Sequence, residues 1–127
     1  MKLSVLDQSP IIAGCTAADA IAATLELAQA AEALGYQRYW LAEHHGLQSL
    51  ADPCSEILLA RIGSLTKKIR IGTGGILLPY YAPFKVAELI ALLDGALPLD
   101  HPYAEVALQS DVAAAYGAFV GARPRQH

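Results

Sequence analysis

Apolar and polar positions along the first 95 residues form blocks of two kinds. Short apolar runs of strand length lie at residues 3–7, 38–42 and 69–78. Each run is followed by a longer segment in which apolar residues recur every three or four positions, as on a helix with one buried face. Strands that alternate with helices at intervals of about 30 to 35 residues are typical of right-handed βαβ units. The pattern therefore predicts a parallel sheet covered by helices.

Capping signals bound the three expected helices. Thr16 stands three residues before Asp19, as in a capping box, and Gly35 is expected to end the first helix. A carboxylate at Asp52, followed by a proline, predicts the start of the second helix, and Pro83 opens the third. The side chains expected to face the sheet are Ala20, Thr24, Leu27, Ala31 and Leu34, then Leu58, Leu59, Ile62 and Leu65, then Val86, Leu89, Ile90 and Leu93.

The residues that follow the strands are the candidates for chemistry. In parallel α/β folds the carboxyl ends of the strands open on one rim, where ligands bind. The residues placed on that rim are Asp7, Glu43, His44, His45, Gly74 and Gly75. An acid beside two imidazoles is costly to hide in a core, so residues 43–45 indicate either a working site or a solvated turn.

Two further motifs partly resemble nucleotide and metal sites. The glycines of residues 72–75 fit neither the dinucleotide fingerprint nor a phosphate-binding loop, which leaves a structural bulge or a flat platform for a ligand. The run Glu43, His44, His45 lacks the helical spacing of an HExxH zinc site. We therefore expect no metal.

Composition narrows the function classes. A chain of 127 residues with 54% hydrophobic and 17% charged residues is long enough for one domain with its own core. The formal net charge of -3 argues against nucleic acid as a partner. No apolar stretch is long enough to span a membrane and no signal peptide is evident, so we expect a cytoplasmic protein. The two cysteines show neither disulfide nor zinc spacing.

Four blocks of the sequence closely resemble the amino-terminal third of the bacterial luciferase-like flavin monooxygenases. They are LDQSP at 6–10, GYQRYWLAEHH at 35–45, IRIGTGGILLP at 69–79 and PFKVAE at 83–88. The resemblance implies the amino-terminal βαβαβα portion of a TIM (β/α)8 barrel, an α/β fold. It also implies binding of reduced FMN at the rim, use of oxygen, and oxidation of a small organic substrate such as an aldehyde.

Roles for individual residues follow from this resemblance. His44 matches the histidine that acts as acid/base beside the flavin, and an imidazole suits this task because its pKa lies near neutrality. Gly74 and Gly75 match a small-residue pair that carries a cis peptide against the flavin ring. The full cofactor-binding set is Glu43, Thr73, Gly74 and Gly75, and the substrate-pocket set is Asp7 and His45.

The resemblance also implies partners. We expect a flavin reductase and a homodimer formed through the second and third helices. A deazaflavin is the alternative cofactor.

The resemblance ends near Gly95. We expect two segments: a luciferase-like partial barrel at 1–95 and an unmatched, alanine-rich segment at 96–127, with loose helices between residues 104 and 120. A complete barrel takes about 250 residues, so a truncated or frame-shifted product or a short homologue is expected, inactive on its own. The alternative function is a catalytically silent remnant that serves as an interaction or flavin-holding module.

Overall fold

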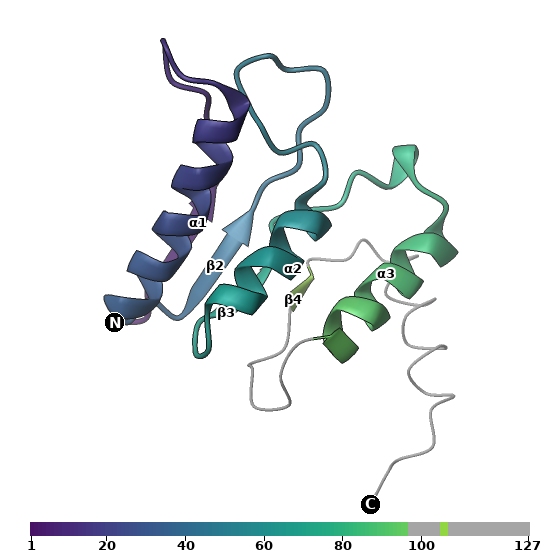
Figure 1. Ribbon diagram of the computed structural model, residues 1–127. Helices are drawn as coiled ribbons and strands as arrows, with labels where there is room; N and C mark the ends of the chain where they lie inside the picture. The colour runs from purple at the N-terminus through teal and green to yellow at the C-terminus, as the bar shows by residue number, and fades with distance from the viewer. Residues whose placement is uncertain (97–104, 107–127) are drawn as a thin grey trace, which may run out of the picture.

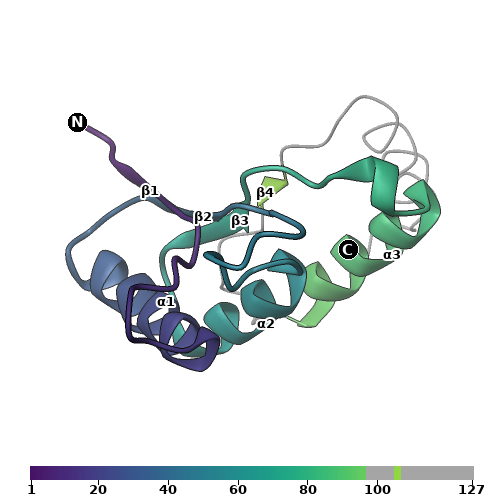
Figure 2. The same cartoon turned by 90° about the horizontal axis from the view of Figure 1, so that it is seen from above.

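The computed structural model describes residues 1–96 and 105–106 (Figure 1). Four parallel strands form one sheet in the order β1-β2-β3-β4: β1 is Ser4–Asp7, β2 is Arg38–Leu41, β3 is Arg70–Thr73 and β4 is Glu105–Val106. Helices α1 (Ala17–Ala33), α2 (Ser55–Leu65) and α3 (Pro83–Ala96) follow the first three strands. Seen from above, they lie along one side of the sheet (Figure 2). The predicted order of strands and helices is confirmed.

The two faces of the sheet differ. Tyr39, Leu41 and Ile71 point to the helices and are at most 1% exposed, forming the centre of the core with Leu59 and Ile62 of α2. Leu6 and Trp40 are paired in the register and lie on the opposite face, because side chains alternate along a strand. Leu6 is 61% exposed. Within the described residues, the helices cover only one face.

Helix α1 begins as predicted but is rotated about its axis. The Thr16 side chain accepts the Asp19 amide at 3.2 Å, and Asp19 accepts the Thr16 amide at 2.7 Å, so the capping box is confirmed. The buried residues are Ala20, Thr24, Leu25, Ala28 and Ala31. Leu27 and Leu34 are 44% and 77% exposed, so their predicted burial was wrong. Thr24, whose hydroxyl donates to the Asp7 carboxylate, forms a row with Ala28 and Ala31 at helical spacing; Leu27 lies beside this row, and Leu34 is the C-cap, beyond the helix end.

Helix α2 begins later than predicted. Asp52 does not cap it: the N-cap is Cys54, which makes no side-chain capping bond. Asp52 instead lies in the segment before the helix, where its carbonyl accepts the His44 amide at 3.4 Å and its carboxylate is buried. Leu58, Leu59 and Ile62 are buried as predicted, whereas Leu65, in the last turn, is 43% exposed.

The third strand is shorter than predicted, because the chain leaves the ladder after Thr73. The Gly74 amide still bonds the Leu41 carbonyl at 2.6 Å, and Leu78–Tyr80 then forms a 3-10 turn. The described residues contain no cis peptide bond, so the cis bond expected at Gly74 and Gly75 is not found.

Helix α3 buries Val86, Ile90 and Leu93, with Leu89 partly covered. Strand β4 pairs Glu105 with Gly72 and Val106 with Thr73. A helix was expected at these two residues, and that prediction was wrong: backbone partners on the open edge of β3 favour a strand there. The remainder of the predicted 96–127 segment lies outside the described residues.

Candidate functional site

An open depression of about 310 Å³ lies at the carboxyl ends of β1, β2 and β3. Its lining residues lie in β1 or in the segments after the three strands: Leu6, Gln8, Ala42, Glu43, His44, Gly74, Gly75 and Leu77. Ligand sites in proteins span about 300–1,000 Å³ and are mostly apolar with a few polar groups. Four of the residues predicted for the rim, Glu43, His44, Gly74 and Gly75, therefore come together in a space of suitable size.

The two glycines shape the wall of this depression. A Cβ atom at Gly74 would lie 3.0 Å from Leu6 Cδ1, so any side chain there would displace Leu6. A Cβ atom at Gly75 would meet no atom within 4 Å. Glycines at such a place leave a surface that a flat ligand can approach closely.

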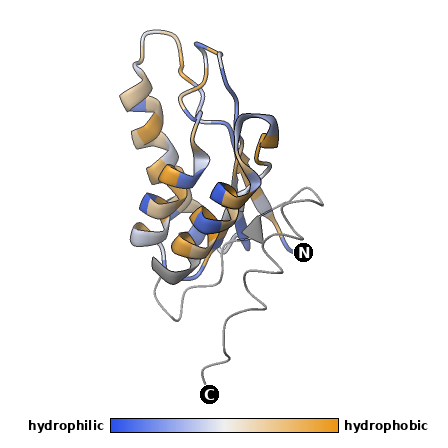
Figure 3. Cartoon of the chain, turned by 90° about the vertical axis from the view of Figure 1, so that its right-hand side faces the viewer, coloured by the Kyte–Doolittle hydropathy of each residue, from blue (hydrophilic) through white to orange (hydrophobic). Residues whose placement is uncertain are grey.

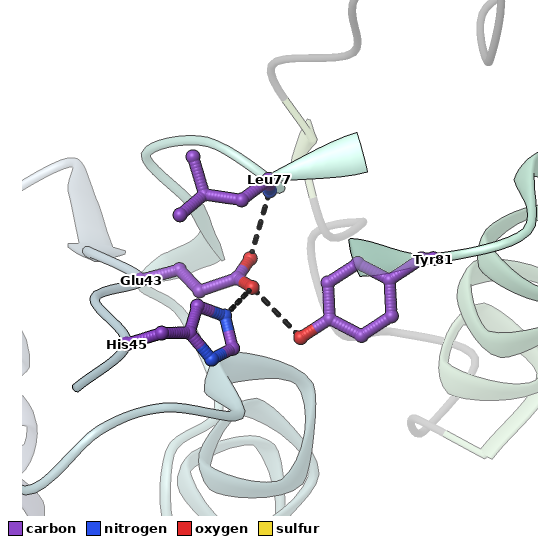
Figure 4. A network of polar contacts seen from close by, with 4 residues as sticks. All are labelled: Glu43, His45, Leu77 and Tyr81. Carbon is purple, nitrogen blue, oxygen red and sulfur yellow. Dashed lines mark hydrogen bonds and ion pairs between the residues drawn. The ribbon is translucent and has the colours of Figure 1, made fainter. Parts of the chain in front are cut away.

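The carboxylate of Glu43 is held by three donors (Figure 4). Its Oε1 lies 2.6 Å from His45 Nε2 and accepts the Tyr81 hydroxyl at 2.7 Å, while Oε2 accepts the Leu77 amide at 3.1 Å. The Glu43 side chain is 1% exposed. Burial, followed by this hydrogen bond, raises the pKa of the Tyr81 phenol, which stays a donor.

His44 and His45 lie differently, although they are adjacent. The His45 ring lies 4.6 Å from the ring of Tyr80 and 6.3 Å from that of Tyr81, and it is absent from the lining of the depression. His44 does line the depression. Glu43 lines the depression with His44, so of these three consecutive residues only His45 is absent from the lining.

Asp7 is the centre of a second buried network. Its Oδ1 accepts the Ser9 amide at 2.9 Å, and its Oδ2 accepts the hydroxyls of Thr24 and Tyr39, each at 2.7 Å. Asp7 is 6% exposed and does not line the depression. These contacts place it between β1, α1 and β2, on the helix side of the sheet.

Three further buried groups lack a hydrogen-bond partner within the described residues. They are both carboxylate oxygens of Asp52, the Ser55 hydroxyl and the Thr73 hydroxyl. Burial raises the pKa of Asp52 to about 6; the nearby Cys54 backbone amide opposes this rise, and the charges of Glu56, Asp7 and Glu43 add to it. Thr73, the last residue of β3, lines an apolar cavity beside α2 and α3 and is absent from the depression's lining.

A model of the luciferase-like monooxygenase family matches residues 1–98. The chain belongs to the luciferase-like monooxygenase family. This membership agrees with the resemblance seen in the four sequence blocks. It covers all three strand-and-helix units that build the depression.

Among its curated relatives is an N-acetyl-S-alkylcysteine monooxygenase of Bacillus subtilis (strain 168), 46% identical over 98 residues. The alignment covers 77% of this chain and 29% of that protein. A luciferase-like monooxygenase of Escherichia coli (strain K12) is 38% identical over 98 residues, again 77% of this chain and 29% of the relative. The chain thus spans about a third of the length of these relatives.

Solved structures show the same fold. The structure of apo-MsnO8 matches with a TM-score of 0.76 and 40% identity, over 92% of this chain and 37% of that one. The oxygenating constituent of 3,6-diketocamphane monooxygenase from Pseudomonas putida, in complex with FMN, matches with a TM-score of 0.72 and 21% identity, over 92% and 33% of the two chains. An F420-dependent secondary alcohol dehydrogenase matches at 0.61 and 23%, over 83% and 31%. The βαβαβα unit is therefore the amino-terminal part of the family's TIM barrel, as the sequence predicted.

Sequence reasoning missed the partner of Glu43. Tyr81 stands just beyond the predicted third strand, and the Tyr80-Tyr81 pair after Pro79 was the available signal. The cofactor role of Thr73 and the pocket roles of Asp7 and His45 stay predictions. No helix in residues 1–96 is long and apolar enough to cross a bilayer. Within the same described part, no three His, Cys, Asp or Glu side chains gather as metal ligands would.

Proposed function

We propose that this chain forms the part of a flavin-dependent monooxygenase that presents His44 to reduced FMN and a small organic substrate. One observation carries the proposal: His44 shares the depression at the strand ends with Gly74 and Gly75. An imidazole with access to the same space as a flat, side-chain-free wall combines a proton-handling group with room for a ring system.

The residues of the depression fit one side of a flavin ring. Gly75 leaves open space where a Cβ would project, and Leu6 and Ala42 supply apolar surface beside it. No lysine or arginine lines the depression among the described residues, so the phosphate of FMN would be held by other parts of a complete barrel. Bound reduced FMN would supply the electrons for reaction with oxygen.

The chain's own residues would hold and move a proton. His44 would accept a proton from the substrate at one ring nitrogen and return it as the product forms. Glu43 would hold the rim loops in place through its three donors. The apolar wall would exclude water from the reacting face.

A chimera in which residues 1–96 of this chain replace the matching segment of the Bacillus subtilis N-acetyl-S-alkylcysteine monooxygenase tests this function in a complete barrel. We expect the chimera to oxidise that relative's substrate with FMN, and His44→Ala to lower turnover by about 10²–10⁴-fold with FMN affinity nearly unchanged. Added imidazole should restore part of the activity. Leu47→Ala, which changes an exposed residue of the same loop, is the matched control. Loss of FMN binding in His44→Ala with turnover intact per bound flavin would contradict the assignment.

Cofactor and substrate are the finer parts of the proposal. Proteins of this fold bind FMN or F420, so a deazaflavin stays the alternative. Flavin titration of the chimera against F420 separates the two. An aldehyde as substrate and a flavin reductase as supplier of reduced FMN stay predictions, as does the silent, flavin-holding alternative.

Assembly is a further part of the proposal. Helices α2 and α3 expose the large apolar residues Ile57, Leu65, Phe84 and Leu92, and apolar segments of the helices are visible in Figure 3. Exposed apolar surface of this kind favours association, which supports the homodimer expected through these helices. Sedimentation velocity checks it.

A further inference from the structure

Two loops of the rim meet at Glu43. This residue follows β2, whereas Leu77 and Tyr81, which donate to its carboxylate, follow β3 and lie 34 and 38 positions further along the chain. Figure 4 shows the two donors approaching the carboxylate from the side of the β3–α3 segment. A single side chain therefore joins the two loops that border the depression.

Burial strengthens the contact between Glu43 and its donors. The Glu43 side chain is 1% exposed, and a buried carboxylate is costly unless donors surround it. Loss of one donor would leave the buried charge short of a hydrogen bond, which is costly. The contacts to Glu43 therefore hold the two loops together.

His45 supplies a second anchor on the same loop. Its Nε2 lies 2.6 Å from Glu43 Oε1, and its ring packs on Tyr80 at 4.6 Å between centroids. The backbone is thus fixed on both sides of His44. Because Glu43 and His45 are both held, the backbone between them has little freedom, and this restricts the directions that the His44 side chain can take beside the depression that it lines.

We propose that Tyr81 and Glu43 are positioning residues for His44: the hydrogen bond between them latches the two rim loops and sets the direction of the His44 imidazole. The proposal deepens the proposed function, on which the proton-handling role of His44 rests. It gives Glu43 a role exerted through its neighbour, and the cofactor contact expected for Glu43 stays a prediction.

Tyr81→Phe in the 127-residue chain tests the latch, since it removes the donor hydroxyl and keeps the ring. Tyr80→Phe is the matched control, because it removes a hydroxyl from the adjacent, 66% exposed tyrosine and keeps the ring that packs on His45. Glu43→Gln, which removes the charge at constant shape, is the second variant. The readouts are the imidazole NMR signals of ¹⁵N-labelled histidines, assigned with His44→Ala, and amide hydrogen exchange.

We expect one sharp set of His44 ring signals in the parent chain and in Tyr80→Phe. Tyr81→Phe and Glu43→Gln should broaden or double that set and speed exchange of the His44 and Leu77 amides by about 5–10-fold. Amides of β1 and α1 should exchange as in the parent. Unchanged His44 signals in both variants would overturn the proposal. Equal acceleration throughout the chain, or unfolding, would overturn it as well, because a latch acts on two loops only.

Addition of millimolar FMN separates this proposal from the proposed function. If both hold, FMN shifts the His44 ring signals in the parent chain, and the shift falls at least about 3-fold in Tyr81→Phe at the same concentration. If FMN shifts no signal in the parent, the proposed function fails while the latch stands on the free-protein spectra. If FMN shifts parent and Tyr81→Phe alike, the latch does not position His44 for the ligand.

Discussion

Two buried carboxylates, Asp7 and Glu43, have the same kind of partner but lie in different parts of the molecule. Each is 6% exposed and accepts a tyrosine hydroxyl at 2.7 Å. The partners of Asp7 come from the residues after β1, from α1 and from β2, and they are almost fully buried. Those of Glu43 come from the segment after β3 and from His45, whose side chain is 26% exposed. The Asp7 carboxylate connects consecutive elements inside the fold, and the Glu43 carboxylate connects two loops beside an open depression.

This difference shows that chemistry alone does not identify a site. An Asp–Tyr pair under the helix layer fixes the rotation of α1 and the pairing of β1 with β2, so it serves the fold. A Glu–Tyr pair at the rim fixes the direction of its neighbour His44. What separates the two is whether the carboxylate's surroundings open on a space where a ligand fits.

Paired alanine variants give the largest expected effect on stability. Asp7→Ala leaves the buried Ser9 amide without its acceptor and removes one acceptor from each of the hydroxyls of Thr24 and Tyr39, so the free energy of unfolding should fall by about 3 kcal/mol. Glu43→Ala should cost less, about 1–2 kcal/mol, because His45 can reach water. Urea unfolding followed by circular dichroism measures both. Equal losses, or a larger loss for Glu43→Ala, would remove the distinction between fold and rim.

The sequence predicted the elements and the rim, but not every orientation on it. Hydrophobic period and caps placed three strands and three helices, because these signals are local. The direction of Asp7 depends on Thr24 and Tyr39, which lie 17 and 32 positions away, and no local pattern encodes that contact. For the same reason Tyr81 was missed as the partner of Glu43. Leu27 was placed in the core but lies at the edge of the buried side of α1, which runs through Thr24, Leu25, Ala28 and Ala31.

Asp52 offers a third case for the comparison. It is a buried carboxylate near both networks, and its two carboxylate oxygens have no hydrogen-bond partner among the described residues. Its folded-state pKa of about 6 lies above the ordinary value of 3.8, so the folded state binds the proton more tightly. The free energy of unfolding should therefore fall by about 1–3 kcal/mol as pH rises from about 4 to 6 and Asp52 ionises. Above about pH 6 this loss should persist.

The measurement is the difference in unfolding free energy between the parent chain and Asp52→Asn across that pH range. We expect Asp52→Asn to be the more stable protein at pH 7–8, with the gap closing on acidification. A gap that is independent of pH would show that Asp52 titrates at its ordinary pKa.

The central claim is that the depression beside His44, Gly74 and Gly75 receives the flavin. An FMN titration of the 127-residue chain, followed by amide chemical shifts, tests it most directly. Because the described residues offer only one side of a site, we expect a dissociation constant in the high micromolar range or weaker, about 5–6 kcal/mol of binding free energy, and no turnover. Shifts should concentrate at Ala42, His44, Gly74 and Gly75.

Gly75→Phe makes the titration decisive, since a side chain there fills open space without meeting an atom within 4 Å at its Cβ. We expect it to weaken FMN binding at least about 10-fold, while Ala22→Phe on the exposed surface of α1 leaves binding unchanged. Equal affinity of Gly75→Phe and the parent chain, or FMN-induced shifts away from these strand ends, would contradict the account.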